Sequence, residues 1–225
     1  MALFLDTGDI SEISKYMKMG IIRGVTTNPT ILFKSGVTGG MEGVKKTSIE
    51  IAKLIAPYPL SVEITENEDP KSMVKEAIEL SGWAGNVVVK VPFHGPNGET
   101  ENLAVIHELE AKHKVKVNAT AMMSAQQGLL AAMAGATYVS IFCGRVNNMG
   151  YNSVEELKKL RHLLDEHDLK AKIICASTRE VLNVVEWLGA GGHIVTVLPN
   201  LLEGMIVHPY TKETVQMFLD DAKRL

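Results

Sequence analysis

The sequence predicts a single (β/α)8 barrel with an additional helix at its C-terminal end. Short runs of apolar and β-branched residues alternate along the whole chain with longer segments of helical periodicity. Eight such units can be distinguished, of roughly 28 residues each, which is the number that closes a parallel sheet into a barrel. The length of 225 residues suits one barrel, so we expect residues 1–225 to form one domain.

The predicted strands are short runs that end in polar residues. They span residues 2–6, 22–26, 60–65, 86–91, 116–119, 138–142, 172–176 and 193–197. Repeated strand–helix units imply parallel strands with helices outside them. An open, doubly wound sheet is the alternative for the same alternation, and the count of eight units favours the closed barrel.

Amphipathic segments between these strands predict the helices. The pattern from Asp9 to Glu12 is typical of a capping box at the start of the first helix. The later helices are predicted at 38–56, 69–81, 99–114, 122–135, 154–167, 178–188 and 199–207. A last amphipathic segment, 212–224, follows no strand, and we expect it to cover a barrel end or to contact a neighbouring subunit.

The composition argues against several classes of function. Net charge is −3 and the pI is about 6.2, which does not favour nucleic acid or an anionic membrane as a partner. No apolar run has the length of a membrane helix, and the first residues do not resemble a secretory signal. The two cysteines lack CxxC spacing, which favours a reducing compartment and predicts a cytoplasmic protein.

Cofactor and metal motifs are not recognisable in the sequence. The seven histidines show neither HExxH nor another chelating spacing, so we expect no metal site. The glycines at 189–192 precede a predicted strand instead of following one, which is the wrong side for a dinucleotide phosphate. We therefore expect no bound cofactor.

Polar residues gather where the predicted strands end. In a (β/α)8 barrel these ends share one rim, and that rim carries the chemistry. Seven of the eight strands deliver a polar or ionisable group there, and the eighth, around Thr196, is expected to contribute little. The groups are Asp6, Asn28, Glu63, Lys90, Asn118 with Thr120, Ser140 with Arg145, and Ser177 with Arg179.

Lys90 is the most informative of these residues. Its neighbours are Val87–Val89 and Val91–Pro92, so the side chain is expected inside the barrel. Burial disfavours the ammonium form, and a neutral amine is the form that attacks a ketone to give a Schiff base. The alternative is a lysine at a strand end whose charged head reaches solvent.

Two carboxylates accompany Lys90. Glu63 lies within an apolar strand and is expected either to pair with Lys90 for structural reasons or to act as a base on a water molecule. Asp6 is expected either to cap the first helix, in competition with Asp9, or to take a proton from a substrate hydroxyl.

Arg145, Ser177 and Arg179 predict an anion site. Two guanidinium groups and a hydroxyl suit a phosphate, and Ser177 is expected at the start of a helix, where free amides face outward. The alternative is that both arginines pair with acidic residues of surface helices.

Several of these motifs together resemble the small branch of the transaldolase family, which also contains fructose-6-phosphate aldolases. The resemblance covers nearly the whole chain. It is carried by Leu5–Thr7, Gly24–Pro29, Val88–Pro92, Ala125–Gly128 with Ala134–Ala136, and Ala176–Ser177. Each motif alone is weak, whereas together they are specific.

The resemblance implies a role for each candidate residue. Lys90 would form the Schiff base, Asp6 would transfer the proton in aldol cleavage, and Glu63 and Thr120 would hold a catalytic water. Asn28, Asn118 and Ser140 would bind the hydroxyls of a dihydroxyacetone unit, with Phe142 beside the imine. Arg145, Ser177 and Arg179 would bind the phosphate of a sugar-phosphate substrate. A cytoplasmic, metal-independent pentamer or decamer is implied in the same way.

Three positions favour the transaldolase branch over the aldolase branch. Phe142 stands where the aldolases resemble one another in having tyrosine, Glu63 replaces a glutamine, and Asn118 replaces an apolar residue. A phenol near the imine would help water to release free dihydroxyacetone, and phenylalanine lacks that hydroxyl. Alternative functions are such an aldolase, a barrel that only binds a phosphorylated metabolite, and a phosphosugar isomerase that uses Glu63 as its base.

Overall fold

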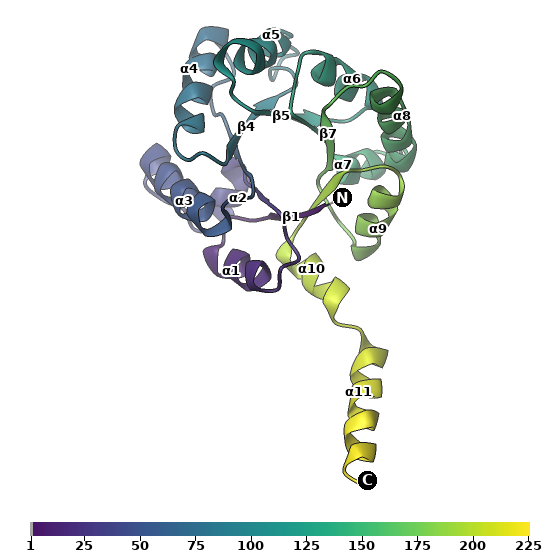
Figure 1. Cartoon of the computed structure of the whole chain (residues 1–225). Helices are drawn as coiled ribbons and strands as arrows, with labels where there is room; N and C mark the ends of the chain where they lie inside the picture. The colour runs from purple at the N-terminus through teal and green to yellow at the C-terminus, as the bar shows by residue number, and fades with distance from the viewer. Residues whose placement is uncertain (1) are drawn as a thin grey trace.

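The computed structural model describes residues 2–225 and contains a closed barrel of eight parallel strands in sequence order, from β1 to β8. Figure 1 looks along the barrel, with the helices arranged as an outer ring. The strands are β1 (Ala2–Asp6), β2 (Val25–Thr26), β3 (Leu60–Glu63), β4 (Val87–Pro92), β5 (Val117–Met122), β6 (Tyr138–Ile141), β7 (Lys172–Cys175) and β8 (Ile194–Val197). The closed barrel is therefore confirmed, and the open sheet was the wrong alternative.

Eleven α-helices and one π-helical turn are present in the described part of the chain. The α-helices are α1 (Ile10–Lys18), α2 (Pro29–Lys34), α3 (Gly40–Ile55), α4 (Pro70–Ser81), α5 (Asn102–Glu108), α6 (Ala125–Met133), α7 (Cys143–Asn148), α8 (Ser153–Glu166), α9 (Val181–Gly189), α10 (Pro199–Ile206) and α11 (Pro209–Ala222). The π-helical turn η1 (Leu109–His113) continues directly from α5.

The interior of the barrel has an apolar floor and a polar upper layer, because side chains alternate along each strand. Phe4, Ile174 and Ile194 form a buried cluster against which Tyr138 packs. Gly24 lies against the Phe4 ring so closely that a Cβ atom would collide with it. The residues two positions further along these strands lie above this floor, and three of them, Asp6, Ser140 and Thr196, are polar. The barrel interior is therefore apolar below, and its polar groups lie toward the carboxyl-terminal rim.

The strand register sets three candidate residues side by side. Glu63 on β3 pairs with Lys90 on β4, and Lys90 pairs in turn with Asn118 on β5. Three adjacent strands therefore present a carboxylate, an amine and an amide at the same height in the barrel.

The first helix begins at its predicted cap but not through the predicted capping box. Asp9 accepts hydrogen bonds from the amides of Ser11 and Glu12, as a capping residue does. The amide of Asp9 itself donates to Thr7 Oγ1 at 3.1 Å instead of to Glu12. Glu12 lies 3.8 Å from the Lys15 ammonium group, so the reciprocal half of the box was wrong.

Two short helices follow strand ends where no helix was predicted. In α2, Asn28 accepts from the Ile31 amide at 2.8 Å and Pro29 occupies the first turn, where a missing N–H costs nothing. The second, α7, begins immediately after Phe142. Each has six residues, which is too short for a periodic apolar stripe to be recognised.

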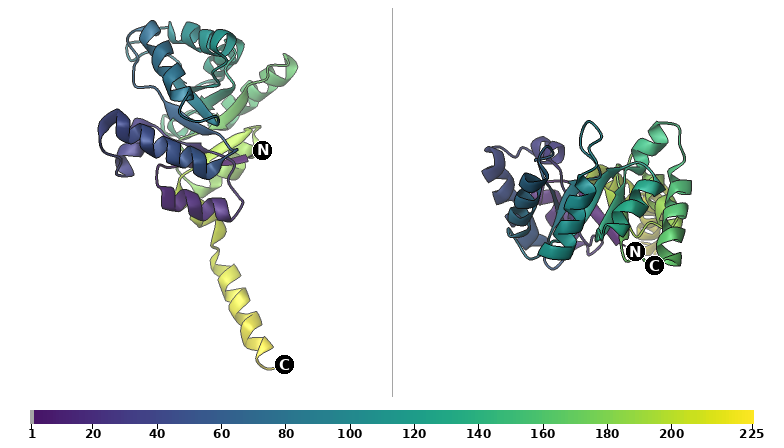
Figure 2. Two further views of the ribbon diagram at one scale, coloured as in Figure 1. Left: turned by 60° about the vertical axis from the view of Figure 1, so that its left-hand side comes forward. Right: turned by 90° about the horizontal axis from the view of Figure 1, so that it is seen from above.

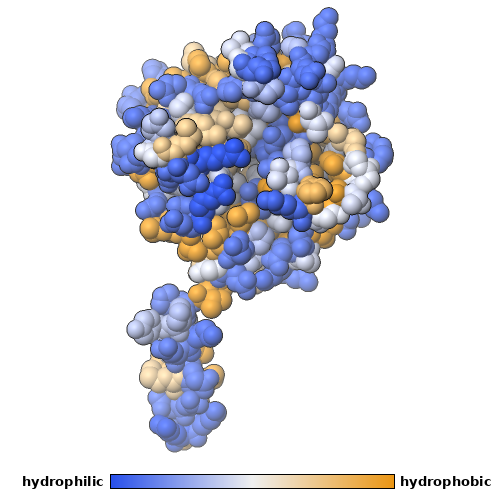
Figure 3. Space-filling model, turned by 180° about the vertical axis from the view of Figure 1, so that it is seen from behind, coloured by the Kyte–Doolittle hydropathy of each residue, from blue (hydrophilic) through white to orange (hydrophobic). Residues whose placement is uncertain are grey.

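The last helix projects away from the barrel, as Figures 1 and 2 show in yellow. None of its residues is buried, although Tyr210, Met217 and Phe218 are large and apolar. Figure 3 shows it standing apart from the body with apolar side chains among hydrophilic ones. The amphipathic helix was predicted, but it does not cover a barrel end. Within residues 2–225, no helix combines the length and apolar character needed to cross a membrane.

Candidate functional site

A cavity of about 260 Å³ opens at the carboxyl-terminal rim of the barrel. Every strand except β3 contributes to its wall, either directly or through the loop that follows it. The residues around it are Asp6, Thr26, Asn28, Thr30, Ile31, Lys34, Lys90, Asn118, Thr120, Ser140, Phe142, Arg145, Ile174, Ala176, Ser177, Thr178, Arg179, Thr196 and Leu198. Ten of the eleven predicted site residues are therefore brought together, and Glu63 is the exception.

Lys90 is buried in the cavity wall, with 5% of its surface exposed. Its Nζ atom lies 2.8 Å from Glu63 Oε2 and donates a hydrogen bond to the Thr27 carbonyl oxygen at 2.9 Å. The alternative of a lysine head in solvent is therefore wrong. Glu63 does not line the cavity and reaches the site through its ion pair with Lys90.

Asp6 lies on the cavity wall and does not cap the first helix, because Asp9 occupies that position. Burial raises the pKa of the Asp6 carboxyl above its ordinary value. A hydrogen bond from Thr26 and the charge of Lys90 partly oppose this rise in pKa, and the charge of Glu63 adds to it. Asp6 is therefore held in a site that favours its protonated form more than water does.

Thr26 and Thr196 are polar residues of the site that the sequence did not identify. Thr26 Oγ1 donates to Asp6 Oδ1 at 2.6 Å, and the hydroxyl oxygens of Thr26 and Thr196 are 2.5 Å apart. The expectation that the eighth strand contributes little was thus wrong. Thr196 follows Ile194 by two residues on β8, so it faces inward above the apolar floor.

A second group of polar side chains lies on β3, β5 and β6. Ser140 Oγ donates to Asn118 Oδ1 at 2.7 Å, and Asn118 Nδ2 donates to Ser61 Oγ at 3.2 Å. Thr120 is buried on the same wall, and its hydroxyl has no hydrogen-bond partner within residues 2–225. A buried hydroxyl that is left unpaired is costly, so Thr120 is suited to bind a group that enters the cavity.

The arginine pair lies at the mouth of the cavity, in the segments that follow β6 and β7. Arg145 stacks on the Phe142 ring, with its guanidinium carbon 5.2 Å from the ring centre. Neither Arg145 nor Arg179 makes an ion pair with an acidic residue in the described chain. The alternative of surface pairing is therefore wrong for residues 2–225.

Ser177 joins the arginines, but for a different reason from the one predicted. The helix expected at 178–188 begins only at Val181, so Ser177 is not at a helix start. Instead it has φ of 64°, a left-handed conformation that a residue with a side chain seldom adopts. Gly144 packs against the Ser177 carbonyl so closely that a Cβ atom would overlap it. The loop and the start of α7 therefore form one packed unit.

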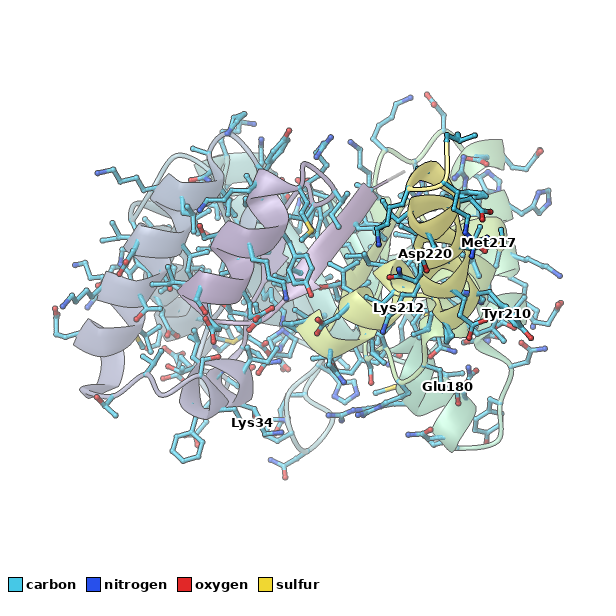
Figure 4. The ribbon with its side chains drawn as sticks, turned by 90° about the horizontal axis from the view of Figure 1, so that it is seen from below. Lys34, Glu180, Tyr210, Lys212, Met217 and Asp220 are labelled. Carbon is cyan, nitrogen blue, oxygen red and sulfur yellow. The ribbon has the colours of Figure 1, made fainter. Side chains whose placement is uncertain are left out.

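Lys34 is a further cation at the cavity that sequence reasoning missed. It closes α2, which was not predicted, and it lines the mouth together with Thr30. Figure 4 shows Lys34 and Glu180 at the same end of the barrel, on elements that flank this mouth. Three cationic side chains therefore surround the opening, in a protein whose net charge is negative.

The described residues do not include a group of side chains that could bind a metal ion. No three side chains of histidine, cysteine, aspartate or glutamate are grouped there so as to hold an ion. The cavity is instead lined by a buried amine, Lys90, a second amine at the mouth, Lys34, one carboxylate, hydroxyl and amide groups, and guanidinium groups. Such a set is suited to covalent amine chemistry on a hydroxylated, anionic molecule.

Comparisons with known proteins agree with this arrangement. The family described as Transaldolase/Fructose-6-phosphate aldolase matches residues 3–225. A "Probable transaldolase 2" of Listeria monocytogenes is 41% identical over 221 residues, which are 98% of this chain and 95% of that protein. A "Probable transaldolase" of Carboxydothermus hydrogenoformans is 38% identical, with coverage of 98% and 97%.

Solved structures of more distant proteins share the fold alone. Thiamine phosphate pyrophosphorylase from Pyrococcus furiosus aligns with a TM-score of 0.61 at 12% identity, covering 88% of this chain and 85% of that one. An N-acetylmannosamine-6-phosphate 2-epimerase from Clostridium perfringens aligns with a TM-score of 0.55 at 18% identity, covering 97% and 92%. On the strength of the family match and the close relatives, the chain belongs to the transaldolase/fructose-6-phosphate aldolase family.

Proposed function

We propose that the protein is a transaldolase of the non-oxidative pentose phosphate pathway. It transfers a dihydroxyacetone unit from sedoheptulose 7-phosphate or fructose 6-phosphate to glyceraldehyde 3-phosphate or erythrose 4-phosphate. The observation that carries this proposal is the buried Lys90 amine, which shares one cavity with Asp6 and with two unpaired arginines. The family match and the names of the relatives support the same reaction class.

Substrate binding begins with the phosphate, which we assign to Arg145, Arg179 and Ser177. Guanidinium groups bind phosphate through paired hydrogen bonds, and neither arginine has to break an ion pair within residues 2–225 to do so. Asn28, Asn118 and Ser140 then bind the hydroxyls of the three-carbon unit. Asn118 and Ser140 already bond to each other, so each keeps a fixed orientation as the sugar enters.

Schiff-base formation takes place at Lys90. Proton transfer from the ammonium group to Glu63 across 2.8 Å frees the nitrogen lone pair, which attacks C2 of the ketose. The C2 oxygen takes up protons and leaves as water, so that a C=N bond replaces the C=O bond. Glu63 and the unpaired hydroxyl of Thr120 are the groups that hold and activate this water.

Cleavage of the C3–C4 bond requires a base, and we assign this role to Asp6. Asp6 takes the proton of the C4 hydroxyl, the C3–C4 electron pair moves into the imine, and the aldose phosphate leaves. A second aldose phosphate then binds, the same steps run in reverse, and water releases the new ketose. The raised pKa of Asp6 suits a group that must accept a proton and return it in each cycle.

Phe142 supports transfer in preference to release of free dihydroxyacetone. It lies on the cavity wall beneath the Arg145 guanidinium group and offers no hydroxyl to activate water at the imine. The covalent intermediate therefore waits for an acceptor aldehyde. Fructose-6-phosphate aldolase activity is the second candidate function, because the matched family contains both activities.

The test is the release of glyceraldehyde 3-phosphate from fructose 6-phosphate, with and without erythrose 4-phosphate. Release that depends on erythrose 4-phosphate supports the transaldolase, whereas equal release without it identifies an aldolase. Borohydride reduction in the presence of fructose 6-phosphate should leave a permanent adduct on Lys90. A binding protein or an isomerase that uses Glu63 would give no such adduct.

We also propose that the protein is a cytoplasmic homo-oligomer, as pentamers or decamers in this family imply. The support for an oligomer is α11, which has no buried residue and carries exposed apolar side chains. Tyr210 and Met217 lie on the same side of this helix in Figure 4, which indicates an apolar stripe with no partner in the single chain. A second copy of the chain would cover this stripe.

A further inference from the structure

A chain of two threonine hydroxyls leads from β8 to the Asp6 carboxylate. Thr196 Oγ1 lies 2.5 Å from Thr26 Oγ1, and Thr26 Oγ1 donates to Asp6 Oδ1 at 2.6 Å. Thr26 and Thr196 are 3% and 2% exposed, so bulk water does not compete for these bonds. The three residues come from three neighbouring strands, because β1 pairs with β2 on one side and with β8 on the other.

The donor and the acceptor of each hydrogen bond follow from counting the protons that the two hydroxyls can donate. A threonine hydroxyl has one proton to donate and two lone pairs that accept. Thr26 gives its proton to the Asp6 carboxylate, which can only accept while it is ionised. Thr26 must therefore accept from Thr196, and Thr196 is the donor of the 2.5 Å bond. Both hydroxyls thus point their protons toward Asp6.

We propose that Thr196, acting through Thr26, is a positioning residue that fixes the Asp6 carboxylate, holding Oδ1 and leaving Oδ2 to face the substrate. This inference rests on the proposed function, in which Asp6 moves the proton of the C4 hydroxyl. Two hydroxyls in series polarise one another, so the bond to Oδ1 is stronger than one from Thr26 alone. The carboxylate is thereby oriented before the substrate arrives.

Thr196 is itself held in place by the loop that carries part of the anion site. Thr178 Oγ1 donates to the Thr196 carbonyl oxygen at 2.6 Å, and Thr178 lies between Ser177 and Arg179. The end of β8 is therefore tied to the β7–α9 loop on one side and to Asp6 on the other. This contact gives Thr196 a fixed backbone from which its hydroxyl reaches Thr26.

The hydrogen bonds from Thr196 through Thr26 also affect the pH at which Asp6 is ionised. Burial raises the pKa of Asp6, the bond from Thr26 and the charge of Lys90 lower it, and Glu63 raises it. Lys90 and Glu63 are the charged groups that bear on Asp6, while Thr26 of β2 bonds to it directly and Thr196 of β8 bonds to Thr26. Removing the Thr196 hydroxyl weakens the bond from Thr26, so the pKa of Asp6 should rise further.

The test compares Thr196→Val, which replaces the hydroxyl with a methyl group of similar size, with Thr196→Ser, which keeps the hydroxyl. Single-turnover cleavage of fructose 6-phosphate is measured against pH in the full-length enzyme. Thr137→Val is the matched control, because the Thr137 hydroxyl bonds to Glu110 at the opposite end of the barrel. Thr26→Val, which removes the last hydroxyl before Asp6, serves as a second variant.

In Thr196→Val we expect the cleavage rate to fall about tenfold, as for loss of one buried hydrogen bond between neutral groups, because the bond from Thr26 to Asp6 is then weaker. KM should change less than about twofold, because the sugar does not contact Thr196 in the proposed mode. The acidic limb of the profile should move up by about half a pH unit, and further in Thr26→Val. Thr196→Ser should restore both the cleavage rate and the pH position of the acidic limb. Thr137→Val should leave the acidic limb at the same pH as in the parent.

An unchanged acidic limb in both Thr196→Val and Thr26→Val would overturn the inference, even if both variants lost thermal stability. So would a Thr196→Ser variant as slow as Thr196→Val. Borohydride trapping distinguishes these failures from failure of the proposed function. If the parent enzyme forms no adduct on Lys90, the proposed function falls, and this inference falls with it. If the parent and Thr196→Val form equal amounts of the Lys90 adduct, the position of the acidic limb decides whether Thr196 acts on Asp6.

Discussion

Replacing Lys90 with methionine should separate the chemical role of the amine from its structural role. Methionine keeps an unbranched side chain but can neither form an imine nor pair with Glu63. Turnover should fall to trace levels, because no other lysine lies within the cavity except Lys34 at the mouth. The variant should also be less stable, because it leaves Glu63 without its partner at 2.8 Å and the Thr27 carbonyl without its donor.

The loss of stability can be estimated from the burial of the pair. Breaking a fully buried ion pair costs about 3–5 kcal/mol. The side chain of Lys90 is 7% exposed and that of Glu63 is 18% exposed, so water can reach the remaining carboxylate. The lower end, about 3 kcal/mol, is therefore expected, which corresponds to a fall in Tm of about 6–12 °C for a chain of this size.

The assay is urea unfolding of the parent, Lys90→Met, Glu63→Gln and the double variant. The double variant should recover at least about 1 kcal/mol over Lys90→Met, because a neutral amide no longer requires a counter-charge. Equal stability of Lys90→Met and the parent would refute the energetic argument. Turnover above trace in Lys90→Met would refute the mechanism.

Other variants test the remaining parts of the site. Arg145→Ala should raise KM for phosphorylated acceptors by about tenfold or more with a smaller effect on kcat, and an unchanged KM would remove it from the phosphate site. Phe142→Tyr should increase release of free dihydroxyacetone without an acceptor, and no increase would count against the role of its missing hydroxyl. Asp6→Asn should gain stability relative to the parent as pH rises. The raised pKa means that the contribution of Asp6 to stability is fully present only below its unfolded value and is lost as pH rises through the folded pKa. Urea titrations from about pH 4 to about pH 8 measure this difference, and a constant difference would show that the pKa is not raised. Deleting 209–225 should reduce the oligomer to smaller species in sedimentation velocity, and an unchanged mass would place the interface elsewhere.

Most of the barrel could be predicted because the sequence pattern that specifies it, apolar runs alternating with amphipathic segments, is periodic. The strands are apolar runs separated by amphipathic helices, and seven of the eight ended in residues that meet at one cavity. The weakest prediction was the second strand, which has only two residues where five were expected. The residues just before it still hydrogen-bond to β1, through the Arg23 amide to Leu3 and from the Leu5 amide to Gly24, but they are not part of the regular strand. Gly24 also lies against the Phe4 ring, a contact that the sequence pattern does not reveal.

The parts of the site that escaped prediction depend on non-local geometry. Thr196 appeared as one threonine between two valines, and only the register of β8 against β1 turns it toward Asp6. Lys34 lies on a six-residue helix that shows no periodicity. Ser177 adopts a left-handed backbone without being glycine, and this conformation is imposed by its surroundings. By contrast, the pairing of Glu63 with Lys90 followed from adjacent strand ends.

The close packing of Gly144 against Ser177 has a consequence for how this enzyme can change over evolution. Arg145 follows Gly144 directly, and Arg179 follows Ser177 by two residues, so the two guanidinium groups share one rigid mount. The amine and carboxylates lie on other strands, β1, β3 and β4. A side chain at position 144 would collide with the Ser177 carbonyl, and we expect this collision to displace the segments that carry both arginines. If the arginines bind the substrate phosphate as proposed, we expect a single substitution at position 144 to reduce selectivity for a phosphorylated acceptor while leaving the proposed covalent chemistry at Lys90 in place.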